Sequence, residues 1–154
     1  MKLYPLFGNL ADRSVLVVGG GEVAARKCEA LLGTGAHVRV GAPALNERLG
    51  EWARLGRITH LQGAYRPTWL DGAWLVIAAT DDVEVNRRVA DDAAARRILI
   101  NVVDNADLSS FHVPAVIDRA PVQVAISSGG SAPMLARWVR ARIEPMLDHA
   151  RLRV

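Results

Sequence analysis

The chain has 154 residues, of which 51% are hydrophobic and 23% charged, and its formal net charge is +3. This composition is typical of a globular domain with a core, and it excludes an intrinsically disordered chain. No apolar run approaches the ~20 residues that span a bilayer, and the N-terminus lacks the apolar core of a signal peptide. Cys28 is the single cysteine, which excludes an internal disulfide and a thiolate zinc site. Together these features predict a cytoplasmic protein that does not bind a membrane.

Apolar runs alternate with helical patterns over residues 1–108, which we expect to form one domain. Five runs are predicted strands: Ser14–Val18, His37–Gly41, Ile58–Leu61, Ala73–Ala79 and Ile98–Val103. Three helices are predicted between them: Glu22–Leu32, Leu45–Leu55 and Val83 to about Arg96. Strands that are apolar throughout and alternate with helices indicate an α/β fold, a Rossmann-like parallel sheet with helices on both faces.

The pattern changes in residues 109–154, which we expect to form a hairpin followed by a helix. The stretch FHVPAVIDRAPVQVAISSGG predicts two extended segments joined at Asp118–Pro121, an antiparallel hairpin. Ser131 is a candidate N-cap for the helix, with Pro133 in its first turn. Apolar residues are predicted to share one side of this helix: Leu135, Trp138, Val139, Ile143, Met146 and Leu147. Pro145 is expected to kink the helix or divide it.

A glycine-rich turn joins the first predicted strand to the first helix. Gly19, Gly21 and Ala24 fit the pattern G-x-G-x-x-A, with Glu22 and Val23 in the first helical turn. Gly19 permits the tight turn, Gly21 permits close approach of a pyrophosphate, and Ala24 permits close packing of helix on strand. The pyrophosphate would lie at the helix N-terminus, over unpaired N–H groups. The turn therefore predicts a dinucleotide-binding site.

The acidic residue that normally binds the adenosine ribose, about 20 residues further on, is missing. The sequence there is GAPA, so the backbone groups of Pro43 and Ala44 are the candidate ribose contacts. No arginine directly follows the strand to bind a 2′-phosphate, because Arg39 lies within the strand and Arg48 lies farther along. These residues favour NAD over NADP as the cofactor.

Polar residues also follow the fourth and fifth predicted strands, where an open parallel sheet places its ligands. Thr80 is a candidate to face the cofactor, and either Asp81 or Asp82 is expected to cap the next helix. Asp104 ends the run ILINVVD and would project toward the cleft that holds a nicotinamide. An aspartate that only forms a turn is the alternative at that position.

The basic residues are mostly arginine and gather in the last stretch, ARWVRARIEPMLDHARLRV. Arginine binds carboxylates and phosphates through its planar fork. A solvated helix face is the alternative interpretation. No helix-turn-helix, zinc-ligand or base-stacking pattern accompanies the charge, so we expect no nucleic-acid partner.

Several motifs occur in one order and at close spacing: VVGGGEVAARK, AATDD, NVVD, SFHVPAVIDR and PVQVAISSGGSAPMLAR. In these motifs the chain resembles the N-terminal module of siroheme synthase, a bifunctional precorrin-2 dehydrogenase and sirohydrochlorin ferrochelatase. The resemblance implies NAD-dependent oxidation of precorrin-2, a tetrapyrrole, to sirohydrochlorin, followed by insertion of ferrous iron. It also implies a homodimer formed through the hairpin and the following helix, and a base for both reactions at Asp104.

The resemblance points to further substrate contacts in the second half. Ser127 and Ser128 match the family's SSGG stretch and are candidates to meet a substrate carboxylate; a modified Ser128 would repel it. Three arginines are candidate partners for the carboxylates of precorrin-2: Arg119, Arg137 and Arg140. His112 has no Cys or carboxylate at ligand spacing, so a structural histidine is the alternative to a role in iron delivery, and no metal site is predicted.

Two other classes of protein open with a similar glycine turn. A regulatory domain that senses NAD(H) without catalysis explains the turn, but it does not explain NVVD followed by the hairpin and SSGG. A short reductase would carry a Tyr-x-x-x-Lys pair, and neither Tyr4 nor Tyr65 is followed by such a lysine. Members of the resembled family continue into a further helical region after the point that matches Val154. The chain is therefore expected to be either a naturally short form or a fragment.

Overall fold

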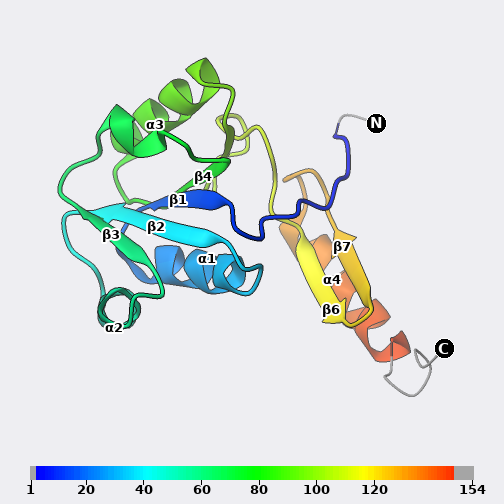
Figure 1. The fold of residues 1–154 in the computed structure, drawn as a ribbon. Coiled ribbons are helices and arrows are strands. Elements are labelled where there is room, and N and C mark those ends of the chain that lie inside the picture. Colours follow the sequence, from blue (N-terminus) through cyan, green and yellow to red (C-terminus); the bar gives the residue numbers. More distant parts are fainter. Residues whose placement is uncertain (1–2, 148–154) are drawn as a thin grey trace. The chain divides into compact units, whose positions relative to one another are not determined.

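The computed structural model describes residues 3–147 and divides the chain into two units (Figure 1). One unit is Leu6–Phe111, and the other combines the N-terminal residues as far as Pro5 with the chain from His112 onward. Residues 148–154, the end of the predicted basic stretch, lie outside the described residues. Among the residues described, no helix has the length and apolar character to cross a membrane.

A parallel sheet of five strands forms the centre of the unit Leu6–Phe111. Its strands are β1 (Ser14–Val18), β2 (His37–Ala42), β3 (Thr59–Gln62), β4 (Leu75–Ala78) and β5 (Leu99–Val102). Their order across the sheet is β3-β2-β1-β4-β5, so β1 lies between β2 and β4. The chain winds outward from β1 in one direction and then returns to wind in the other. The carboxyl ends of β1 and β4 therefore meet at the switch point where such sheets bind ligands.

Helices cover both faces of this sheet, as Figure 1 shows. α1 (Glu22–Leu32) and α2 (Glu47–Arg54) cover one face, while α3 (Val83–Ala95) and the 3-10 helix η1 (Pro67–Leu70) cover the other. Side chains of β1 alternate between the two cores: Val15 and Val17 pack toward α1, and Leu16 and Val18 toward α3. The predicted Rossmann-like fold is confirmed.

α1 packs closely on the sheet because its inward face is made of small side chains. Ala24, Ala25 and Cys28 are fully buried there, and Leu31 nearly so. Burial raises the pKa of the Cys28 thiol to about 12, so this thiol stays protonated at neutral pH. The close packing brings the N-terminus of α1 next to the carboxyl end of β1.

The glycine in β2 makes room for an aromatic ring from η1. A Cβ placed on Gly41 would lie 2.2 Å from Cζ3 of Trp69, closer than real atoms approach. Trp69 is itself buried and meets Tyr65 edge-to-face, with ring centroids 5.9 Å apart. Gly41 thus belongs to the core beneath η1, and β2 continues one residue beyond the predicted end, to Ala42.

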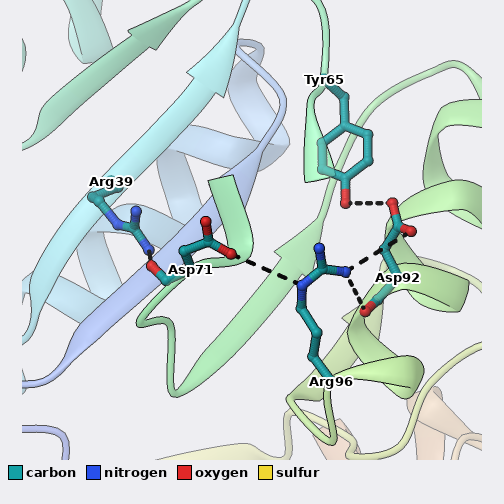
Figure 2. Close-up of polar contacts among 5 residues, drawn as sticks. All are labelled: Arg39, Tyr65, Asp71, Asp92 and Arg96. Atoms are coloured by element: carbon teal, nitrogen blue, oxygen red, sulfur yellow. Dashed lines mark hydrogen bonds and ion pairs between the residues drawn. The ribbon is translucent and has the colours of Figure 1, made fainter. Parts of the chain in front are cut away.

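Polar contacts hold the connection between β3 and β4 against α3 (Figure 2). The Tyr65 hydroxyl donates to Oδ2 of Asp92 at 3.0 Å, and burial together with this carboxylate raises the pKa of Tyr65. Nε of Arg96 lies 4.0 Å from Oδ1 of Asp71. Arg39 donates from its guanidinium to the backbone carbonyl of Asp71 at 3.1 Å. Arg39 is therefore engaged on the α3 side of the sheet.

The second unit contains a two-stranded antiparallel hairpin and a helix. β6 (Ala115–Arg119) pairs with β7 (Val122–Ile126), which confirms the predicted hairpin. α4 (Pro133–Ile143) lies against both strands, and Ile117 of β6 and Ala136 of α4 are the buried side chains between them. Arg119 forms an ion pair with Glu144 at 2.8 Å, and Arg140 forms one with the same carboxylate at 3.4 Å.

The start of α4 differs from the prediction. Ala132, not Ser131, is the N-cap residue, and no side chain caps the helix. The Ser131 hydroxyl instead donates to the carbonyl of Ser128 at 2.6 Å. This hydrogen bond stabilises the turn that precedes α4. The predicted break at Pro145 is confirmed, because α4 ends at Ile143 and a 3-10 helix, η2 (Glu144–Met146), follows.

The predicted apolar side of α4 is divided between two surfaces. Ala136 is buried against the hairpin, and Val139 and Ile143, at helical spacing from it, are half-buried. Leu135 and Trp138 were predicted on the same side but are 54% and 55% exposed. The prediction of a single buried apolar face on α4 is therefore wrong within one chain. The two-stranded hairpin is too narrow to cover all of these side chains.

The Gly41–Trp69 contact gives a test of the core. Gly41→Ala should lower the free energy of unfolding by about 1–3 kcal/mol, because the added methyl group overpacks the ring of Trp69. Gly50→Ala is the matched control, since nothing lies within 4 Å of its added Cβ and it sits inside α2. The control should stabilise the helix by up to about 1 kcal/mol. Urea unfolding of both variants measures the difference, and equal stabilities would contradict the packing.

Candidate nucleotide-binding and catalytic site

The glycine turn after β1 is fixed by close backbone contacts on both sides. Gly19 has a φ of +132°, and a Cβ there would lie 2.4 Å from the carbonyl oxygen of Ala79. A Cβ on Gly20 would lie 1.9 Å from the carbonyl oxygen of Ala44. The first two glycines are therefore required by the loops after β4 and β2, independently of any ligand.

Gly21, the third glycine, is different because nothing within residues 3–147 lies within 4 Å of its added Cβ. It is the N-cap of α1, and no side chain accepts from the first N–H groups of this helix. By contrast, Asn46 caps α2 and Asp82 caps α3 through side-chain oxygens. The first N–H groups of α1, beginning with Glu22 and Val23, thus have no side-chain cap among the described residues. This arrangement fits a dinucleotide pyrophosphate.

The loop after β2 carries no carboxylate at the predicted ribose position. Pro43 and Ala44 are exposed, and the Ala44 carbonyl packs on the glycine turn. The backbone N–H of Asn46 donates to the carbonyl of Gly20 at 2.8 Å, which fastens the loop to the turn. Pro43 and Ala44 therefore border the glycine turn, and their contact with a ribose stays a prediction.

Thr80, in the loop after β4, bonds within its own segment. Its hydroxyl donates to Oδ1 of Asn86 at 2.8 Å, and Nδ2 of Asn86 donates back to the Thr80 carbonyl at 2.8 Å. Asn86 is buried, with 8% of its surface exposed. Asp82 rather than Asp81 caps α3, accepting from Glu84 and Val85. Thr80 thus shapes the loop beside the glycine turn, and its role toward a cofactor stays a prediction.

Asp104 lies just beyond the carboxyl end of β5, in the same unit as the glycine turn. It is exposed and has a φ of +58°, within a short turn in which Val102 bridges to Asn105. The Ser109 hydroxyl secures both ends of this turn, since it accepts from the N–H of Val102 at 2.9 Å and approaches the Asn105 carbonyl at 2.7 Å. The left-handed backbone is thus held by its surroundings.

Lys27 of α1 is the basic residue that interacts electrostatically with Asp104. Burial lowers the pKa of Lys27, and the charge of Arg26 lowers it further, while Asp104 acts in the opposite direction. The charge of Asp104 thus acts on a half-buried ammonium group of α1.

The other predicted site residues belong to the hairpin unit. Oγ of Ser127 accepts from the N–H of Gly129, and Oγ of Ser128 accepts from the N–H of Ala132, each at 3.1 Å. Arg119 and Arg140 are both engaged with Glu144, and Arg137 is exposed. His112 is half-buried. In residues 3–147 no group of three or more His, Cys, Asp and Glu side chains is placed to hold a metal ion.

Sequence reasoning missed the residues that position this site from a distance. Ser109 is one of two serines in DLSSF, and nothing in that string shows that its hydroxyl reaches back to β5. Asn46, followed by a helix, carries the ordinary signal of an N-cap. That signal could have placed the start of α2 at Glu47, but it could not have shown the contact with the glycine turn.

Comparison with protein-family models gives two matches along the chain. Residues 6–115 match the family described as putative NAD(P)-binding. Residues 119–146 match the family described as sirohaem biosynthesis protein central. The first match covers the whole parallel sheet, and the second covers the last residue of β6, all of β7 and all of α4.

The chain is also similar to curated proteins and to a solved structure. It is 55% identical over 147 residues to a siroheme synthase of Xylella fastidiosa (strain M12), an alignment that covers 95% of this chain and 31% of the relative. A siroheme synthase of Chromobacterium violaceum is 52% identical, with 96% and 31% covered. The chain thus spans about a third of the length of these relatives. A solved structure of SirC, precorrin-2 dehydrogenase, is 27% identical with a TM-score of 0.82, covering 97% of this chain and 73% of that one.

The contrast between the glycines gives a test of the turn. Gly21→Ala should weaken NAD⁺ binding by at least about tenfold, because the methyl group would occupy the space that a pyrophosphate needs. The fold should tolerate it, since the backbone of Gly21 has a φ of −92° and no neighbour is close. Titration calorimetry and thermal melting measure both effects, with Gly50→Ala as the control. Unchanged affinity would mean that no phosphate approaches Gly21.

Proposed function

The chain belongs to the putative NAD(P)-binding family, and on that premise we propose that it oxidises precorrin-2 to sirohydrochlorin with NAD⁺ as the hydride acceptor. Ferrous iron is then a substrate for insertion into the product, which yields siroheme. We place both reactions in the cytoplasm, as the composition predicts.

The observation that carries the proposal is the likeness in fold, and the position of Asp104 after β5 adds support to it. The likeness to precorrin-2 dehydrogenase extends over 97% of the chain, hairpin and α4 included. A domain that only senses a nucleotide needs the glycine turn but has no need of a carboxylate held beyond β5. Asp104 is such a carboxylate, and its turn is secured by Ser109.

The glycine turn, with the N–H groups of Glu22 and Val23, would hold the pyrophosphate of NAD⁺. When bound, NAD⁺ supplies the electron-pair acceptor, since its nicotinamide takes up a hydride. Ala24 keeps α1 close to the sheet, and Thr80 maintains the neighbouring loop through Asn86. These residues orient and bind, and none of them transfers a proton.

Asp104 takes up the proton that the oxidation releases. Conversion of precorrin-2 to sirohydrochlorin removes one hydride and one proton, so a base is needed beside the hydride acceptor. Iron insertion releases two further protons from pyrrole nitrogens, and the same carboxylate can accept them in turn. The exposed position of Asp104 suits a base that must return its protons to water.

We also propose that the hairpin unit binds the carboxylates of the tetrapyrrole. Ser127 and Ser128 lie in a turn with two glycines of positive φ, Gly129 and Gly130. Arg137 is exposed, while Arg119 and Arg140 would have to exchange Glu144 for the substrate. Arg137 is therefore the arginine that supports this role best.

Replacement of Asp104 tests the proposed chemistry. Asp104→Asn should lower the rate of sirohydrochlorin formation by about 10²–10⁴-fold, the contribution of a general base. NAD⁺ affinity should stay within about twofold, because Asp104 follows β5 whereas the proposed pyrophosphate site is the turn after β1. Anaerobic absorbance measurements with precorrin-2 and NAD⁺ give the rate, and calorimetry gives the affinity. Asp107→Asn, an exposed aspartate of the same loop, is the matched control.

Two results would contradict this role. Equal rates in Asp104→Asn and Asp107→Asn would remove Asp104 from the chemistry. Binding of NAD⁺ without any turnover by the parent chain would favour the sensing domain instead.

We further propose that two copies of the chain associate through α4. Four large apolar side chains of α4 and η2 are exposed: Met134, Leu135, Trp138 and Met146. Such a group of exposed apolar residues is characteristic of an interface. In a homodimer the partner would cover the side chains that the narrow hairpin leaves open.

A pair of tryptophan variants tests the dimer. Trp138→Glu should convert a dimer into a monomer, because a charge would be buried in the interface. Trp74→Glu is the matched control, since Trp74 is 53% exposed and Trp138 55%. Light scattering after gel filtration measures the mass of each variant. A monomeric parent, or a Trp138→Glu dimer, would contradict the interface.

A further inference from the structure

We propose that Glu22 replaces the missing ribose-binding acid and, by holding Arg48, makes this chain select NAD over NADP. The inference deepens the proposed function and rests on it, because it concerns the same dinucleotide site. Glu22, Asn46 and Arg48 belong to one unit, and Glu22 contacts each of the other two.

The loop after β2 leaves room for an acid from elsewhere. In related folds a carboxylate at the end of the second strand binds the ribose diol. Here β2 ends at Ala42, and Pro43 and Ala44 follow. The loop is nevertheless fastened to the glycine turn through the Asn46 N–H and the Gly20 carbonyl, 2.8 Å apart. The sugar next to the turn would therefore meet this loop.

The side chain of Glu22 reaches this loop from the first turn of α1. Its Oε2 accepts from Nδ2 of Asn46 at 3.3 Å, and its Oε1 lies 3.8 Å from the guanidinium of Arg48. The Asn46 amide is fixed in orientation, because its Oδ1 accepts from the N–H of Leu49 at 2.9 Å. These contacts direct the carboxylate to the end of the loop after β2, where α2 begins. It remains 68% exposed, and so stays accessible to a ligand.

A carboxylate at this point discriminates between the two cofactors by charge. It can accept hydrogen bonds from both ribose hydroxyls of NAD, whereas the 2′-phosphate of NADP would meet it as a like charge. The hydrogen bonds and the repulsion act in the same direction, so both favour NAD.

The Glu22 carboxylate also affects cofactor selection through its ion pair with Arg48. Its guanidinium pairs with Glu22 and Glu29 and lies 4.8 Å from the ring centroid of Trp52. It is the arginine placed beside Glu22, whereas Arg39 is engaged with the Asp71 carbonyl on the α3 side. Removal of the Glu22 charge would release one side of Arg48 toward a 2′-phosphate.

Dissociation constants for NAD⁺ and NADP⁺, measured by titration calorimetry, test this inference. The parent should bind NAD⁺ at least about tenfold more tightly than NADP⁺. Glu22→Gln should reduce that ratio by about tenfold, the effect of one hydrogen bond to a charged group. Both a weaker NAD⁺ complex and a tighter NADP⁺ complex should contribute. Glu47→Gln, which removes an exposed glutamate at the start of α2, is the matched control and should leave the ratio unchanged.

The double variant Glu22→Gln/Arg48→Gln separates the two effects. It should lose the gain in NADP⁺ affinity while NAD⁺ binding remains weak. A parent that binds NAD⁺ but shows the same ratio after Glu22→Gln would overturn the inference and leave the proposed function standing. A parent that binds neither dinucleotide would overturn both.

Discussion

The close approach of two loops to the glycine turn is the constraint on which the rest of the site depends. The Ala79 carbonyl oxygen would clash with a Cβ on Gly19, and the Ala44 carbonyl oxygen would clash with a Cβ on Gly20. Any side chain at either position would push one loop away. Because the loops after β2 and β4 are both held on the turn, Asn46 and Thr80 acquire defined positions at the same edge of the sheet. The glycine turn after β1 thereby positions the loops that follow β2 and β4.

Most of the fold could be predicted from the sequence, because its signals are local and repeat. Apolar runs separated by helical patterns gave the parallel sheet, and the SSGG turn marked the end of the hairpin. The predictions were wrong where the local structure depends on a contact with a residue that is distant in sequence or on the surface available for packing. β2 extends to Ala42, one residue past the predicted end, and Gly41 within it packs under the ring of Trp69. The Ser128 carbonyl takes the Ser131 hydroxyl that would otherwise have capped α4. The predicted apolar face of α4 is only partly buried, because one chain provides too little surface to cover it.

Part of the candidate site could also be predicted from the sequence, because its motifs are local. Motif spacing predicts the glycine turn, and the structure places Asp104 after β5 in the same unit. Spacing cannot show what holds the turn around Asp104, because the Ser109 hydroxyl reaches Val102 and Asn105 only after the chain folds back. Nor can spacing show that Glu22 of α1 extends to the loop of another strand. A residue proposed to bind the cofactor can be recognised from the motif around it in the sequence. A residue that only holds another residue in place can be recognised only in the folded structure.

The return of the chain along β5 has a consequence for solubility as well as for chemistry. β5 is an outer strand of the sheet, and an outer strand with free N–H groups invites pairing with another chain. Here the hydroxyls of Ser110 and Ser109 accept from the N–H groups of Ile100 and Val102, so that side of the strand has no donors left to offer. The segment that holds Asp104 is also the segment that covers this edge of the sheet. Substitutions that loosen this loop would therefore tend to expose an aggregation-prone edge, and selection for solubility would preserve the geometry of the carboxylate without acting on catalysis.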